Sequence, residues 1–136
     1  MAKILLVEDA PDLGAYEANI LEAEGHRVLR CNGAPTPLAA CPMMRYGNCP
    51  LPDAADVILF SCSLLMPIGH RTYRGSELLR AYREHPRYGC LPILVVWVGV
   101  PPDVRGTGPI MLLEKFSEPR RVIEAVHELI DLVDVR

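Results

Sequence analysis

Short apolar runs alternate along this chain with longer segments in which apolar residues recur at helical spacing. Residues 3–7, 57–60 and 93–98 form nearly continuous aliphatic or aromatic runs, and the first of them ends in two carboxylates. Runs of this kind are typical of strands buried on both faces of a sheet. With two further short runs at 26–31 and 110–113, the pattern predicts five strands.

Three segments carry the spacing of amphipathic helices. The first covers residues 12–24, where Pro11 suits the first helical turn and Gly25 suits the stop. The others cover residues 76–84 and 117–133, the last with a serine as its expected N-cap. Strands that alternate with helices predict a doubly wound, five-stranded parallel sheet with helices on both faces.

Two stretches break this alternation. Five prolines fall between residues 32 and 56, so a second helix there is predicted to be short, irregular and interrupted at Pro42. Residues 99–109 read GVPPDVRGTGP, which leaves little room for a regular fourth helix. The sequence contains neither an internal repeat nor a linker, so residues 1–136 are expected to form one domain.

Composition narrows the class of protein. Half of the 136 residues are apolar, and the net charge of -3 gives no basis for binding nucleic acid. No apolar run reaches the roughly 18 residues that a membrane span needs, and the first residues resemble no signal peptide. We therefore expect a cytoplasmic protein without a membrane partner, in which the five cysteines are thiols.

In doubly wound sheets, ligands gather at the carboxyl ends of the strands. Here the run KILLVEDAPDL, followed by an amphipathic helix and EGHRV, resembles the start of response-regulator receiver domains, which have a flavodoxin-like fold. In that family an acidic pair after the first strand helps to hold magnesium, and Glu8 and Asp9 match it. In LLEKFSEPRRVIEAV, Lys115 resembles the strand-five lysine that contacts the phosphoryl group, although the family's following proline is absent.

The phospho-accepting aspartate of the family is missing. The segment ADVILFSCSLLMP places Ser61 at the acceptor position, or Ser63 if Pro67 sets the register, and no carboxylate lies between Asp56 and Glu77. Asp56 begins the strand and should lie at the opposite edge of the sheet. A carboxylate is ionised at neutral pH, whereas a serine hydroxyl needs a base before it can attack a phosphoryl group.

The switch positions differ as well. The small hydroxyl residue at the end of strand four in the family corresponds to Trp97, and the mobile aromatic of strand five corresponds to Leu112. We expect the indole to lie partly buried over the vacated site. Glu8 and Asp9 would then bind magnesium weakly at most, or form an ion-paired cap with Lys115.

The resemblance implies a stand-alone, non-enzymatic receiver-type domain of two-component phosphorelay signalling. It would act by contact with another signalling protein (a kinase, a regulator or an output protein) or with itself, without aspartyl phosphorylation.

The alternative is a redox or haem sensor built on residues 31–62. Cys41 and Cys49 each precede a proline, and such Cys-Pro pairs supply thiolate ligands in some haem-responsive proteins, while Cys62 is a candidate redox thiol. The cysteine spacing matches no common zinc pattern, and haem is the less favoured reading. Buried structural cysteines are the simpler interpretation.

Overall fold

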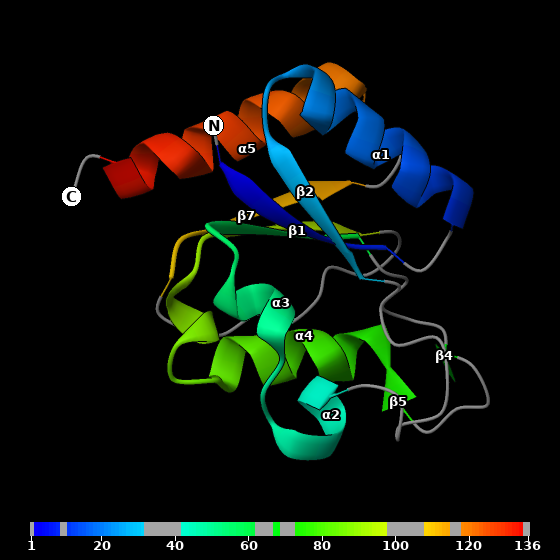
Figure 1. The fold of residues 1–136 in the computed structure, drawn as a ribbon, viewed down its shortest axis with the longest axis vertical. Coiled ribbons are helices and arrows are strands. Elements are labelled where there is room, and N and C mark those ends of the chain that lie inside the picture. Colours follow the sequence, from blue (N-terminus) through cyan, green and yellow to red (C-terminus); the bar gives the residue numbers. More distant parts are fainter. Residues whose placement is uncertain are drawn as a thin grey trace.

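The computed structural model describes residues 2–8, 11–31, 42–61, 67–68, 73–97, 108–114 and 118–134. A parallel sheet forms its centre (Figure 1). Its strands, in spatial order, are β2 (Arg27–Cys31), β1 (Lys3–Val7), β3 (Val57–Phe60), β6 (Ile93–Trp97) and β7 (Ile110–Glu114). The five strands and the doubly wound order confirm the fold class predicted from the alternating pattern.

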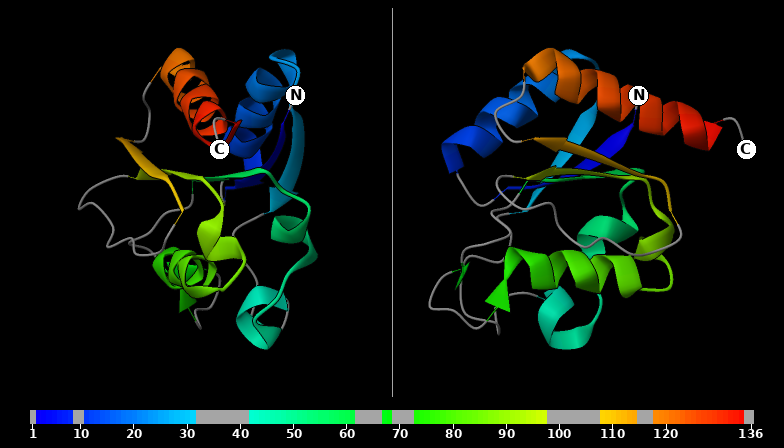
Figure 2. Two further views of the ribbon diagram at one scale, coloured as in Figure 1. Left: turned by 90° about the vertical axis from the view of Figure 1, so that its left-hand side faces the viewer. Right: turned by 180° about the vertical axis from the view of Figure 1, so that it is seen from behind.

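Helices cover the sheet on both sides. On one face lie α1 (Pro11–Ala23) and α5 (Pro119–Asp134), as Figures 1 and 2 show. The other face is covered by α2 (Pro42–Tyr46), α3 (Pro50–Asp53) and α4 (Gly75–Glu84), with the one-turn 3-10 helix η2 (Tyr88–Cys90) leading into β6. Two very short strands, β4 (Pro67–Ile68) and β5 (Tyr73–Arg74), pair antiparallel before α4 and were not expected from the sequence.

The pleat of the strands divides the interior into two cores, because successive side chains point to opposite faces. The α4 core contains the fully buried residues Leu5, Val7, Ile58, Phe60, Leu78, Leu79, Tyr82, Ile93 and Val95. The α1/α5 core contains Ile4, Leu6, Leu21, Val57, Leu59, Leu94, Val126 and Leu129. All four residues of β3 are buried, which explains why that strand reads as an unbroken apolar run.

In the described part of the proline-rich region, prolines start short helices. Pro42 begins α2 and Pro50 begins α3, whereas residues 32–41, which precede Pro42, lie outside the described part, so the expected interruption at Pro42 stays a prediction. Proline suits the first helical position because the N–H that it lacks would have no partner within the helix. The predicted absence of a fourth helix falls mostly on residues 98–107, outside the described part; Gly108 and Pro109 are not helical.

Candidate functional site

Ser61 ends β3 directly beside the end of β1. Phe60 pairs with Val7, and the backbone N–H of Ser61 donates to the Val7 carbonyl at 2.7 Å. Glu8 follows Val7 at the same edge of the sheet. Parallel strands end together at one edge, so the topology brings the side chains of Ser61 and Glu8 side by side. The structure thus places Ser61 at the strand end where the sequence predicted the acceptor position.

Two carboxylates meet the Ser61 hydroxyl inside the fold. Its Oγ lies 2.9 Å from Glu8 Oε1 and 3.2 Å from Glu17 Oε2, and Glu17 comes from α1. The exposed fractions of Ser61, Glu8 and Glu17 are 0%, 4% and 6%. A hydroxyl carries one proton, so it donates to one of the two carboxylates at a time. The serine is therefore a bridge between two buried acids.

Glu17 is the site residue that the sequence reading missed. It lies four residues after Leu13 and four before Leu21, on the side of α1 that faces the sheet, and its neighbour Ala18 is also buried. An acidic residue on the inward stripe of a helix is unusual, because carboxylates are rarely buried without partners. An acidic residue at an inward-facing position of the helix was therefore the feature of the sequence that could have identified Glu17.

Gly14 on α1 lies close to two charged side chains from the strand ends. A Cβ added at Gly14 would lie 2.8 Å from Nη2 of Arg30 and 3.4 Å from Cγ of Glu8. The guanidinium of Arg30, from β2, and the side chain of Glu8 therefore occupy the space that a larger residue at position 14 would fill. The glycine leaves room for both side chains beneath the first turns of α1.

Because the Ser61 hydroxyl is enclosed within the protein, few reactions are open to it. A carboxylate 2.9 Å from a serine hydroxyl is close enough to accept its proton as a general base. A nucleophile must also reach its substrate, and Ser61 has no exposed surface. The arrangement is suited to holding α1 against the ends of β1 and β3.

Trp97 lies half-buried, but on the other side of the sheet. Its indole packs against the α4 core, together with Val95 and Phe60. Ser61 reaches Glu17 on the α1 side. The expectation that the indole covers the Ser61 position is wrong, because the alternation of side chains along the strands turns Trp97 to the opposite face. Leu112 on β7 is 42% exposed.

Three predicted site residues, Asp9, Ser63 and Lys115, lie outside the described residues. Glu8 is the described member of the acidic pair, and one of its oxygens contacts Ser61 within the protein interior. Among the described residues, no group of three or more histidine, cysteine or acidic side chains is arranged to hold a metal ion.

The cysteine-rich segment is built into the fold in its described part. Cys49 is buried in the α4 core, its N–H donates to Tyr88 Oη at 3.2 Å, and that hydroxyl donates to the Cys49 carbonyl at 2.8 Å. A haem ligand or a redox thiol needs access that this side chain lacks. Cys41 and Cys62 lie outside the described residues.

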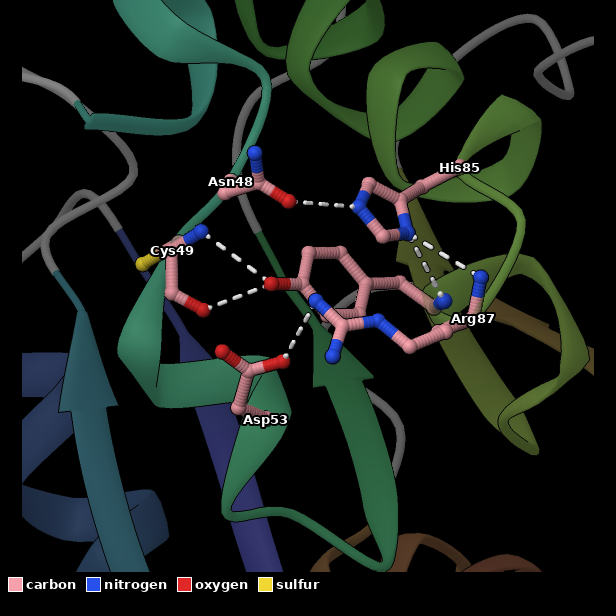
Figure 3. Close-up of polar contacts among 6 residues, drawn as sticks. Asn48, Cys49, Asp53, His85 and Arg87 are labelled. Carbon is pink, nitrogen blue, oxygen red and sulfur yellow. Dashed lines mark hydrogen bonds and ion pairs between the residues drawn. The ribbon is translucent and has the colours of Figure 1, made fainter.

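A second polar cluster surrounds Tyr88 (Figure 3). Nδ1 of His85 accepts from the backbone N–H groups of Arg87 and Tyr88, so its proton lies on Nε2, which donates to Asn48 Oδ1 at 3.0 Å. The imidazole stacks on the Tyr88 ring at 3.7 Å, and Arg87 pairs with Asp53 at 3.2 Å. These contacts attach the segment around α2 and α3 to the end of α4 and are structural.

Structural comparison identifies the fold. The receiver domain of a response regulator from Clostridium thermocellum superposes with a TM-score of 0.66 at 17% identity, covering 99% of this chain and 98% of that one. The receiver domain of a histidine kinase from Syntrophus aciditrophicus gives 0.69 at 19%, covering 98% and 92%. The chemotaxis protein CheY4 of Vibrio cholerae gives 0.62 at 22%, covering 95% and 98%.

No protein-family model matches the sequence, and no curated protein matches it. Within the described part of the chain, no helix has the length and apolarity to cross a bilayer. The sheet order, the covering helices and the structural neighbours together show that the chain has the fold of response-regulator receiver domains.

Proposed function

We propose that this chain is a receiver-type domain of two-component signalling that passes its signal by protein–protein contact, without aspartyl phosphorylation. The observation that carries the proposal is Ser61. It stands at the end of the strand where receivers keep the acceptor aspartate, and its hydroxyl is enclosed between Glu8 and Glu17. The nucleophile of the family is replaced by a group that holds the fold together.

The charges around Ser61 also support a domain that is not phosphorylated there. Phosphoryl transfer requires that the negative charge of the phosphoryl group be neutralised, usually by a metal ion and a lysine. The Ser61 hydroxyl contacts two acidic side chains, Glu8 and Glu17, and carboxylates beside an acceptor oppose the approach of a phosphoryl group. An added phosphate would also have to enter a position with no exposed surface.

The experiment is phosphorylation by acetyl phosphate with Mg²⁺, followed by intact-mass spectrometry. A receiver that retains its aspartate serves as the positive control in the same buffer. We expect the control to gain one phosphoryl group and this chain to gain none. A high yield of singly phosphorylated protein would disprove the proposal.

Identifying a binding partner tests the proposed signalling role. Affinity capture from the native cell, with the wild-type chain as bait, should enrich a kinase, a regulator or an output protein of a two-component pathway. Binding that persists with phosphatase-treated bait supports signalling by contact. Binding that depends on prior phosphorylation of the bait contradicts it.

A further inference from the structure

Two histidines from distant parts of the sequence meet on the α1/α5 side of the sheet. Nε2 of His26 lies 2.9 Å from Nε2 of His127, and the two rings meet edge to face with centroids 5.1 Å apart. His26 precedes β2, and His127 lies near the middle of α5. Both are partly buried. The site is separate from the Ser61 cluster.

The backbone fixes which ring nitrogen carries each proton. The N–H of Ala2 donates to Nδ1 of His26 at 3.2 Å, so this nitrogen presents its lone pair. A neutral His26 then carries its proton on Nε2 and donates it to Nε2 of His127. His127 must in turn carry its proton on Nδ1. The pair is therefore neutral, with one proton between the two facing nitrogens and a different tautomer in each ring.

Local structure holds His26 in place. Gly25 closes α1 with a φ of +90°, a conformation that favours glycine. The N–H of His26 then donates to the Leu21 carbonyl at 3.3 Å, and the N–H of Arg27 donates to the Ala2 carbonyl at 2.9 Å. The histidine pair thus connects the start of β1, the turn between α1 and β2, and α5.

We propose that His26 and His127 form a proton-sensitive latch, which holds α5 against the sheet while the pair is neutral and loosens it when a further proton binds. A proton added to His127 Nε2 removes the hydrogen bond between the rings. A proton added to His26 Nδ1 removes the bond from Ala2. In either case a positive charge is placed in a partly buried position next to the other ring.

The electrostatics agree with this geometry. Burial lowers the pKa of His26 below its ordinary value of 6.5; His127 and the amino-terminal charge also lower it, and Glu24 opposes them. Further charged residues near the pair in sequence or one helical turn away include Lys3, Arg27, Glu124, Glu128 and Asp131. Because the pKa of His26 is depressed in the fold, the unfolded chain takes up this proton at a higher pH. The stabilisation is complete above about pH 6.5 and is lost as the pH falls through the folded-state pKa.

Two measurements on the whole chain test the latch. Long-range ¹H–¹⁵N spectra of the imidazoles at neutral pH should show His26 as the Nε2–H tautomer and His127 as the Nδ1–H tautomer. Two rings of the same tautomer, or a charged ring at neutral pH, would overturn the assignment. Amide exchange in α5, corrected for intrinsic rates, should be about three to ten times faster at about pH 5 than at about pH 7.5, as loss of one hydrogen bond implies.

Histidine variants distinguish an effect of the latch on α5 from a general loss of stability at acid pH. In His26→Gln/His127→Gln the side chains can still hydrogen-bond but do not titrate, so the pH dependence of exchange in α5 should disappear. His85→Gln changes a histidine on the opposite face of the sheet and should leave that dependence as in the wild type. A double variant that keeps the wild-type dependence, or a wild type that shows none, rules out the latch.

Discussion

Glu17 of α1 holds a carboxylate oxygen 3.2 Å from the hydroxyl of Ser61, the residue that ends β3. Helix α1 therefore brings an acidic side chain to the end of β3. Under the function proposed above, Ser61 stands where receivers keep an acceptor aspartate, and two acidic side chains, Glu8 and Glu17, contact it there.

Restoring the aspartate alone should not restore phosphorylation. Ser61→Asp would place a third carboxylate against Glu8 and Glu17, and we expect a loss of at least about 3 kcal/mol in the free energy of unfolding. Urea unfolding and intact-mass spectrometry after acetyl phosphate treatment check both points. The matched variant Ser61→Asp/Glu17→Gln removes one acid and should regain part of the stability. A stable single variant that is phosphorylated in high yield would contradict this account.

Truncating Trp97 should weaken the fold without opening the Ser61 site. The indole is half-buried against the α4 core, so Trp97→Ala should cost about 1–3 kcal/mol, less than the ~3–5 kcal/mol of a fully buried tryptophan. Chemical denaturation measures the loss. Adding Trp97→Thr to Ser61→Asp should not produce a phosphoprotein, because position 97 faces the other side of the sheet. A phosphoprotein from that double variant would show that the two positions share a pocket.

The Tyr88 hydroxyl should contribute measurably to stability. It donates to the Cys49 carbonyl and accepts from the Cys49 N–H, both within the protein interior. Tyr88→Phe leaves these two backbone groups without that partner, and we expect a loss of about 1–3 kcal/mol. The control is Tyr16→Phe, which removes a hydroxyl from a ring that is 51% exposed and should change the unfolding free energy little. Equal losses in the two variants would contradict a special role for Tyr88.

Alkaline pH should destabilise the protein through ionisation of Tyr88. Burial raises the pKa of Tyr88 above its ordinary value of 10.0, and Asp53 raises it further, while the Cys49 hydrogen bond and Arg87 oppose the shift. With a folded-state pKa above the unfolded one, the stabilisation is complete below about pH 10 and is lost as the pH rises through the folded-state pKa. Absorbance of tyrosinate should show one late-ionising tyrosine fewer in Tyr88→Phe than in the wild type. A wild type whose tyrosines all titrate near the ordinary value would refute the prediction.

The sequence by itself determined the architecture of this protein. Nearly continuous apolar runs marked the three inner strands β1, β3 and β6, because strands buried on both faces leave no room for polar residues. Two shorter runs marked the edge strands β2 and β7. Pro11 and Gly25 bounded the first helix to within a residue or two, since each suits one end of a helix for steric reasons. The absence of an acceptor carboxylate between residues 57 and 76 was equally visible in the sequence.

The tertiary structure decided which side chains meet. In the sequence, nothing distinguished Glu17 as a partner of Ser61. The two residues meet because α1 packs against the end of β3. From the sequence, Trp97 was predicted to fill the Ser61 site. In the structure it packs on the other face of the sheet, because one step along a strand reverses the side to which a side chain points. His26 and His127 are 101 residues apart in sequence and meet only when α5 docks. Strand and helix patterns depend on neighbouring residues, whereas such contacts depend on the packing of distant elements.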